Sequence, residues 1–156
     1  MKSLEEYKAF ITKVKKFTGL DSFDSDEDGL VSLRVDDKFN VNFQYITGTR
    51  RFLCFVEVCT LDRNAPRAVY RELLVGALFG KDTAGGYFTI DPSTETLVYN
   101  YFFDGDDVEE DIEGFVQTIE QIMQLCEMWI ERVNAFEDNE KNAEKMETLN
   151  NIINIF

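Results

Sequence analysis

The sequence predicts an α+β fold in which helices pack against a five-stranded antiparallel sheet. Three observations predict this class: a helical apolar stripe opens the chain, period-two alternation follows over residues 31–45, and a second alternating pair lies between two further helical stretches. The expected order is α-β-β-β-α-β-β-α with a helical C-terminal tail. We therefore assign residues 1–134 to one domain and residues 135–156 to a helical extension.

The first helix is predicted over residues 4–18. Ser3 and Glu6 have the spacing of a capping box, in which each side chain can satisfy a free amide at the helix start. Gly19 follows the helix and accepts the left-handed backbone conformation that ends one. The apolar stripe of this helix consists of Leu4, Tyr7, Phe10, Ile11, Val14 and Phe17.

Alternation of apolar and polar residues predicts an antiparallel meander. A half-buried strand is apolar on one face, whereas a central strand is apolar on both. The stretch "DPSTE" joins the last two strands as a short hairpin turn. The expected strands cover residues 31–35, 39–45, 52–59, 87–90 and 97–103.

Two more helices are predicted around the second strand pair. One covers about residues 64–79, with Pro66 in its first turn, where a missing amide costs nothing, and Gly80 as its stop. Residues 73–79 are apolar almost all round, and a helix of this kind is covered on more than one side. In a domain of this size, a second copy of the chain can supply that cover. The other helix covers about residues 107–133.

The composition restricts the function. The formal net charge is −14, which argues against nucleic acids and anionic membranes as partners because both attract basic surfaces. There is no histidine, so histidine-dependent triads, histidine general bases and histidine-bound zinc are excluded. No apolar run approaches the roughly 20 residues of a membrane helix. The opening "MKSLEEYKAF" carries charge where a signal peptide is apolar, which favours a cytoplasmic protein.

The stretch "FDSDEDGLVSL" starts like a calcium-binding EF-hand loop. Such a loop needs a bidentate glutamate at position twelve, and counting from Asp24 that position is Val35. A helix should also follow the loop, yet the residues after Gly29 alternate like a strand. We therefore expect no metal site, and interpret the stretch as an acidic turn before the first strand.

Two other candidate sites also fail. The stretch "GALFGKDTAGG" has three residues between Gly76 and Gly80, where a phosphate-binding loop has four, and its second glycine ends a helix when it should begin one. The three cysteines lie in apolar segments with no histidine to activate them, so we expect buried free thiols. No catalytic group remains, and we expect neither an enzyme nor a cofactor.

Four stretches have the order and spacing typical of a known family. They resemble the class I type III secretion chaperones, small acidic dimers that escort secreted effectors in bacteria, over about residues 3–133. Two departures are visible: Val75-Gly76-Ala77 replaces the usual Ala-Asn pair, and the tail after Val133 is longer than usual. The four stretches are "DGLVSLRVDDKFNVNF", "AVYRELLVGALFG", "GGYFTIDPSTETLVYNYFF" and "FVQTIEQIMQLCEMWIERV".

The resemblance implies a homodimer in the bacterial cytoplasm that binds the N-terminal segment of an effector in extended form. An added strand pairs main-chain groups, and pockets for alternate side chains give selectivity. For contact with the effector we choose aromatic residues of the first helix and second strand, although each can equally be a core residue: Tyr7, Phe10, Phe17, Phe43 and Tyr45. For the dimer interface the apolar girdle of the second helix suggests Leu73, Leu74, Ala77, Leu78 and Phe79.

Two other functions stay open at this point. A YbjN-like regulator shares the same plan of sheet and helices, and binds protein without a role in secretion. An enzyme that works with carboxylates could hold a metal ion on Asp24, Asp26 and Asp28. Calorimetry with calcium or magnesium distinguishes the second alternative from a protein-binding module.

Overall fold

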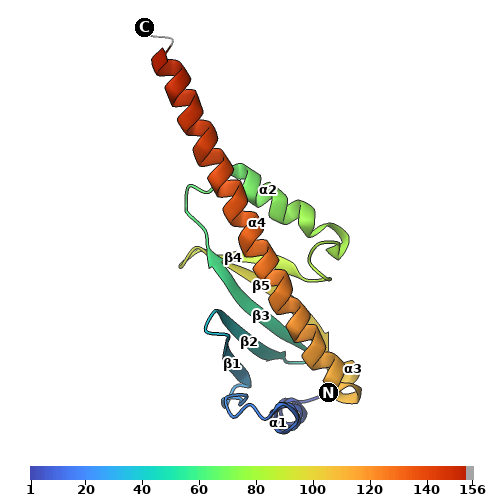
Figure 1. Cartoon of the computed structure of the whole chain (residues 1–156). Coiled ribbons are helices and arrows are strands. Elements are labelled where there is room, and N and C mark those ends of the chain that lie inside the picture. Colours follow the sequence, from blue (N-terminus) through green and yellow to red (C-terminus); the bar gives the residue numbers. More distant parts are fainter. Residues whose placement is uncertain (154–156) are drawn as a thin grey trace.

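The structure is a computed structural model that describes residues 1–153, with the side chains of residue 140 and of residues 148–153 left undescribed. Five strands form one antiparallel sheet, as the sequence predicts, and the structure shows their spatial order to be β1-β2-β3-β5-β4 (Figure 1). β1 and β4 are therefore the edge strands. The strands are β1 (Leu30–Val35), β2 (Phe39–Ile46), β3 (Arg51–Thr60), β4 (Tyr87–Asp91) and β5 (Thr96–Asp104).

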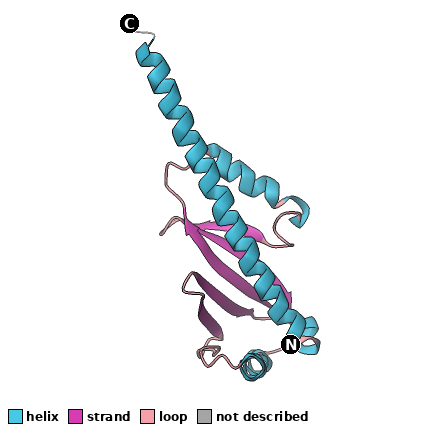
Figure 2. Cartoon of the chain, viewed as in Figure 1, coloured by secondary structure: helices cyan, strands magenta, loops and turns pink. Residues whose placement is uncertain are grey.

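The helices cover one face of the sheet (Figure 2). α1 and α4 contribute buried aromatic side chains to this side, and α2 packs beside α4. Most strand residues that point to the helices are buried, whereas those that point away are mostly half-buried or exposed. The helical elements are α1 (Leu4–Thr18), α2 (Arg67–Gly76), a 3-10 turn η1 (Leu78–Gly80), α3 (Gly105–Glu110) and α4 (Ile112–Ile153).

Phe115 of α4 is the centre of an aromatic core. Its ring centroid lies 5.3 Å from that of Phe10 on α1 and 5.0 Å from that of Phe103 on β5. Phe43 and Phe52, on β2 and β3, each lie 5.9 Å away. Edge-to-face and tilted aromatic pairs at these distances add to the stabilisation that burial itself gives. The core thus ties two helices to three strands.

The first helix ends where the sequence predicts. Ser3 Oγ accepts a hydrogen bond of 3.2 Å from the amide of Glu6, and Gly19 has a positive φ of 70°. The Glu6 carboxylate reaches back to the amide of Lys2, one residue earlier than in a standard capping box. Local capping chemistry therefore sets both ends of α1.

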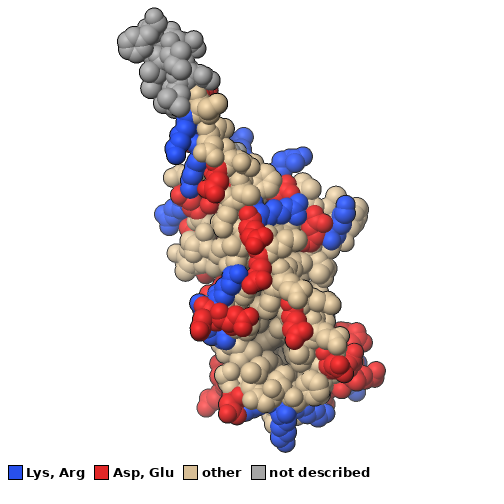
Figure 3. Space-filling model, viewed as in Figure 1, with Lys and Arg blue, Asp and Glu red and all other residues tan. Residues whose placement is uncertain are grey.

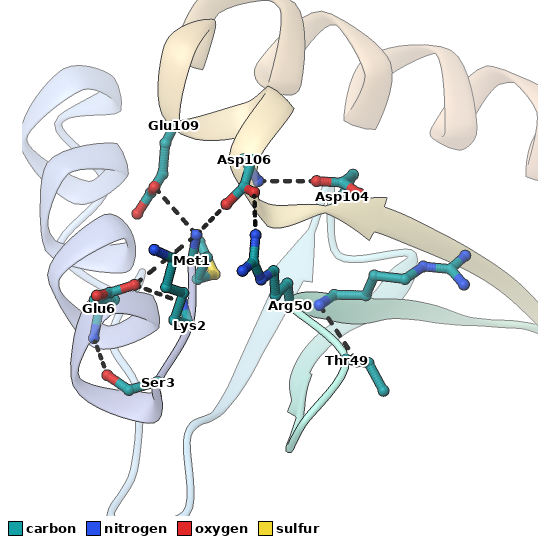
Figure 4. A network of polar contacts seen from close by, with 10 residues as sticks. Met1, Lys2, Ser3, Glu6, Thr49, Arg50, Asp104, Asp106 and Glu109 are labelled. Carbon is teal, nitrogen blue, oxygen red and sulfur yellow. Dashed lines mark hydrogen bonds and ion pairs between the residues drawn. The ribbon is translucent and has the colours of Figure 1, made fainter.

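The start of α1 is also held to α3 by charged groups (Figure 4). The Met1 amino group contacts the carboxylates of Asp106 and Glu109, and Arg50 Nη1 lies 3.3 Å from Asp106 Oδ2. The hydrogen bond from the Met1 amino group, together with the nearby positive charges, lowers the pKa of Asp106. Below this network, the Met1 side chain is buried against Gly105, where an added Cβ would lie 2.4 Å from the Met1 Cβ.

The second helix is shorter than predicted. It begins after Pro66 and ends at Gly76, and the chain then forms the η1 turn. Phe79 has a left-handed φ of 56°, so a continuous helix to this residue is excluded. Gly80 makes a close backbone approach to Gly85, where an added Cβ would lie 2.8 Å from the Gly85 Cα. The regular helix thus ends at Gly76, three residues before the predicted end, and the chain turns at Phe79 and Gly80.

The last helical region is divided differently from the prediction. Asp104 and Asp111 each cap a helix start, since their Oδ1 atoms accept hydrogen bonds of 2.9 Å from Asp106 N and 2.8 Å from Gly114 N. The acidic opening therefore contains two helix starts, those of α3 and α4. α4 then continues through residue 134 to Ile153 without a break, so the predicted tail extends the last helix.

Candidate partner-binding site

Exposed apolar side chains gather on α2 and η1. Leu74 is 76% exposed, Leu78 59% and Phe79 97%, and Val75 lies between them at 48%. Phe79, the most exposed of them, has a left-handed backbone conformation. We call these four residues the α2–η1 surface. A soluble protein rarely leaves several large apolar side chains exposed side by side unless they contact a partner.

A groove of about 260 Å³ lies between α2 and the edge strand β4. Leu73 and Ala77 line it from the helix side, and Phe88 and Ile90 from the strand side. Because β4 is an edge strand, its outer main-chain groups are not paired within the sheet. The groove and the α2–η1 surface share Leu74, so they form one continuous apolar region.

The residues predicted for the dimer interface lie in this region. The structure brings all five together at the end of α2, but their side chains differ in how much they are exposed to solvent. Leu73 is only 5% exposed and belongs to the core, while Ala77 is half-buried. Leu74, Leu78 and Phe79 are the three that face solvent.

Four of the five residues predicted for effector contact are core residues. Tyr7, Phe10 and Phe43 are 0–1% exposed and Tyr45 is 6% exposed, so in this conformation their side chains are not available at the surface. They lie on the helix-facing side of α1 and β2, which the alternation alone could not distinguish from a binding face. Phe17 is the exception at 57%.

Sequence reasoning missed Leu20, which comes after the end of α1. It is 50% exposed and follows the helix stop at Gly19, three residues after the exposed Phe17. A leucine that directly follows a helix stop was the available signal.

Sequence reasoning also missed the sheet face that points away from the helices. Leu53 and Phe102 are paired on this face and half-buried, and the Arg51 guanidinium lies 4.5 Å from the centre of the Phe102 ring. The two-sided apolar pattern of β3 was the signal, because it placed apolar residues on both faces. The neighbouring row across β2, β3, β5 and β4 consists of Asn42, Phe55, Asn100 and Tyr87.

The acidic stretch before β1 forms a turn, as the sequence predicts. Asp26 Oδ1 accepts hydrogen bonds of 2.9 Å from Asp28 N and 2.8 Å from Leu30 N. Gly29 has a φ of 85° and lies against Leu4, where an added Cβ would meet the Leu4 Cδ1 at 2.5 Å. The carboxylate of Asp26 is thus occupied by main-chain amides. Within residues 1–153 no group of three or more acidic or cysteine side chains is arranged to hold a metal ion.

The cysteine thiols are in the apolar interior. Cys54 and Cys126 are buried and Cys59 is half-buried, all as free thiols. Burial raises the pKa of Cys126 to about 12 and that of Cys59 to about 11, and it raises the pKa of Cys54 further. At neutral pH these thiols are protonated, and a protonated thiol is a poor nucleophile.

The glycines of "GALFGKDTAGG" have structural roles. An added Cβ on Gly76 would lie 2.4 Å from Trp129, and Gly80 packs against Gly85. Both glycines allow close packing at the end of α2, and neither begins a helix. Over the described part of the chain no helix is long and apolar enough to cross a membrane.

Several solved structures are similar in fold to this chain. A chain of the ExsC–ExsE complex matches with a TM-score of 0.70 and 19% identity, over 83% of this chain and 94% of that one. The HopA1–SchA chaperone–effector complex gives 0.57 and 17%, over 85% and 93%. The Yersinia pestis type III secretion chaperone SycH, solved with a fragment of YscM2, gives 0.56 and 14%, over 76% and 98%. The chain has the fold of the type III secretion chaperones.

The family follows from a separate comparison. The model of the Tir chaperone protein (CesT) family matches residues 9–130, which is well over half of the chain. The protein belongs to this family of chaperones. The match extends from α1 into α4 and ends before the last part of that helix. No curated protein sequence matches the chain.

Proposed function

We propose that the protein is a homodimeric type III secretion chaperone that binds the N-terminal segment of a secreted effector in extended form and keeps it soluble and competent for secretion. The exposed apolar region at the end of α2 is the observation that carries this proposal. It presents Leu74, Leu78 and Phe79 to solvent beside a groove and an unpaired strand edge. Family membership supports the effector as the second partner.

The dimer is assigned to the α2–η1 surface and the adjoining groove. In a twofold interface the same residues of both copies are buried, and residue i of one copy contacts residue j of the other, so an exposed apolar surface suits a homodimer. The surface is flanked by the edge of β4, which a second copy can also cover.

The effector segment is assigned to the remaining apolar surfaces. Phe17 and Leu20 are exposed at the end of α1, and Phe55 and Phe102 lie on the sheet face away from the helices. An extended segment can pair with a strand edge through its main chain and place alternate side chains against such surfaces. Phe17 is the one predicted effector contact that remains in this assignment.

Matched aspartate substitutions test the two surfaces separately. Leu74→Asp should give a monomer in sedimentation, because a charge buried in an apolar interface is strongly unfavourable. Leu20→Asp places the same charge on another exposed leucine, and should leave the dimer intact while weakening capture of a co-expressed effector. An effector that lacks its N-terminal segment should not be captured by either of these two variants. A soluble Leu74→Asp dimer would show that the interface lies elsewhere.

A further inference from the structure

The last part of α4 lies outside the family match. The match ends at residue 130, whereas the helix continues to Ile153. At 1.5 Å per residue, these additional turns extend the helix by roughly 35 Å. The loop before α2 meets α4 at a small pocket, which Glu137, Lys141 and Glu144 line from the helix side. Figure 1 shows the part of α4 beyond this pocket projecting past the sheet and α2. We call residues 137–153 the arm.

The arm has an exposed apolar side chain, since Met146 is 63% exposed. In the sequence Leu149 and Ile153 follow it at the spacing of one helix face, while most other positions are polar or charged. Tertiary packing supplies most of the stability of a helix in water. A partner surface would therefore stabilise the arm.

The charge of the arm is acidic. Residues 137–153 include five carboxylates and two lysines. A matching surface should be basic as well as apolar, which is uncommon in a chain with a net charge of −14.

α2 and η1 provide such a surface. Arg67, Arg71 and Lys81 are exposed, and among the described residues none of the three has an ion pair. Glu72, the only acidic residue between them, pairs with Arg132. Figure 3 shows basic side chains where Figure 1 places α2. The same surface exposes Leu78 and Phe79, so it complements the arm in both charge and hydrophobicity.

The arm cannot reach this surface on its own subunit. α2 packs antiparallel to α4: Pro66 lies near Glu137, Glu72 pairs with Arg132, and Gly76 lies against Trp129. The arm therefore leaves the body at the start of α2, whereas η1 lies at its other end (Figure 1). α4 is one unbroken helix, so its last turns cannot fold back. We propose that the arm of each copy docks on the α2–η1 surface of a second copy, with Met146 against Phe79 and the acidic residues near Arg67 and Arg71. This inference rests on the proposed homodimer.

Crosslinking between separately purified full-length proteins tests the docking. Phe79→Cys and Met146→Cys are mixed, allowed to exchange subunits, and treated with a short bismaleimide. We expect a crosslink between residues 79 and 146, identified by mass spectrometry. Each variant by itself, and the unsubstituted protein, should not form this crosslink. Lys141→Cys, on the other side of the arm, is the matched control and should crosslink much less. Equal yields from the two arm positions, or a link between two copies of residue 146, would overturn the docking.

Removal of residues 143–156 gives a second measurement. It should raise the dimer dissociation constant at least tenfold in sedimentation, while the far-ultraviolet circular dichroism of the body keeps its shape. If the shortened chain dimerises as tightly as the full chain and Leu74→Asp is monomeric, the docking is wrong and the proposed dimer stands. If the full chain is itself a monomer, the proposed homodimer fails first.

Discussion

Gly76 is the position where two opposing effects on stability can be separated. It is the last residue of α2 and is buried against Trp129 of α4. Replacing it with alanine should favour the helix by up to about 1 kcal/mol, because glycine is a poor helix former. The added Cβ, however, would lie 2.4 Å from Trp129 Cζ2 and 2.5 Å from Cη2.

The contact with Trp129 decides the sign. Both distances are about 1 Å shorter than ordinary carbon contacts. The indole ring is held in place, because its Nε1 donates a hydrogen bond of 2.9 Å to the Asp82 carbonyl and its centroid lies 5.0 Å from that of Phe88. Forcing an extra carbon into a tight core costs roughly 1–3 kcal/mol. We expect Gly76→Ala to lower the free energy of unfolding by up to about 2 kcal/mol, after the full helix gain is subtracted.

A double-mutant cycle with Trp129→Phe isolates the clash. Phenylalanine lacks the two indole carbons that meet the new Cβ, so in this background Gly76→Ala should be neutral or stabilise by up to about 1 kcal/mol. Urea unfolding followed by far-ultraviolet circular dichroism measures all four proteins, at one protein concentration because dimerisation adds to stability. Equal effects of Gly76→Ala in both backgrounds would refute the reasoning.

Two further predictions concern ionisable groups. At pH 8, Cys54 and Cys126 should react with a disulfide reagent only when the protein unfolds, because burial raises their pKa, and rapid reaction of both in the native protein would contradict this. Asp106→Asn should lower the melting temperature at neutral pH. The Met1 amino group lowers the folded-state pKa of Asp106 below its ordinary value of 3.8, so the stabilisation is present above that pH and is lost as pH falls through the folded value. The difference between Asp106→Asn and the unsubstituted protein should therefore shrink in acid, and a constant difference would argue against the charge network.

Elements whose ends depend on nearby residues could be predicted from the sequence. Ser3 and Gly19 set the ends of α1 through their own side chain and backbone geometry, and the observed helix has the predicted ends. The strands follow from alternation, because side chains of period two can bury one face against the helices. The turn before β1 follows from Asp26 and Gly29, which act over a few residues.

Long-range contacts decided what the sequence could not. The end of α2 depends on Gly76 against Trp129 and on Gly80 against Gly85, and neither contact can be inferred from helical periodicity. The continuation of α4 past residue 134 was not predicted, since a polar helix shows no apolar pattern that distinguishes it from a separate tail.

The sequence by itself determined the α+β class, the order of the strands along the chain and both ends of the first helix. It did so because capping, turns and alternation are local properties. Only the tertiary structure decided which apolar side chains are core and which are surface. Tyr7 and Phe17 belong to the same predicted stripe, yet the first is completely buried and the second is 57% exposed, because burial depends on which distant elements pack over each side chain.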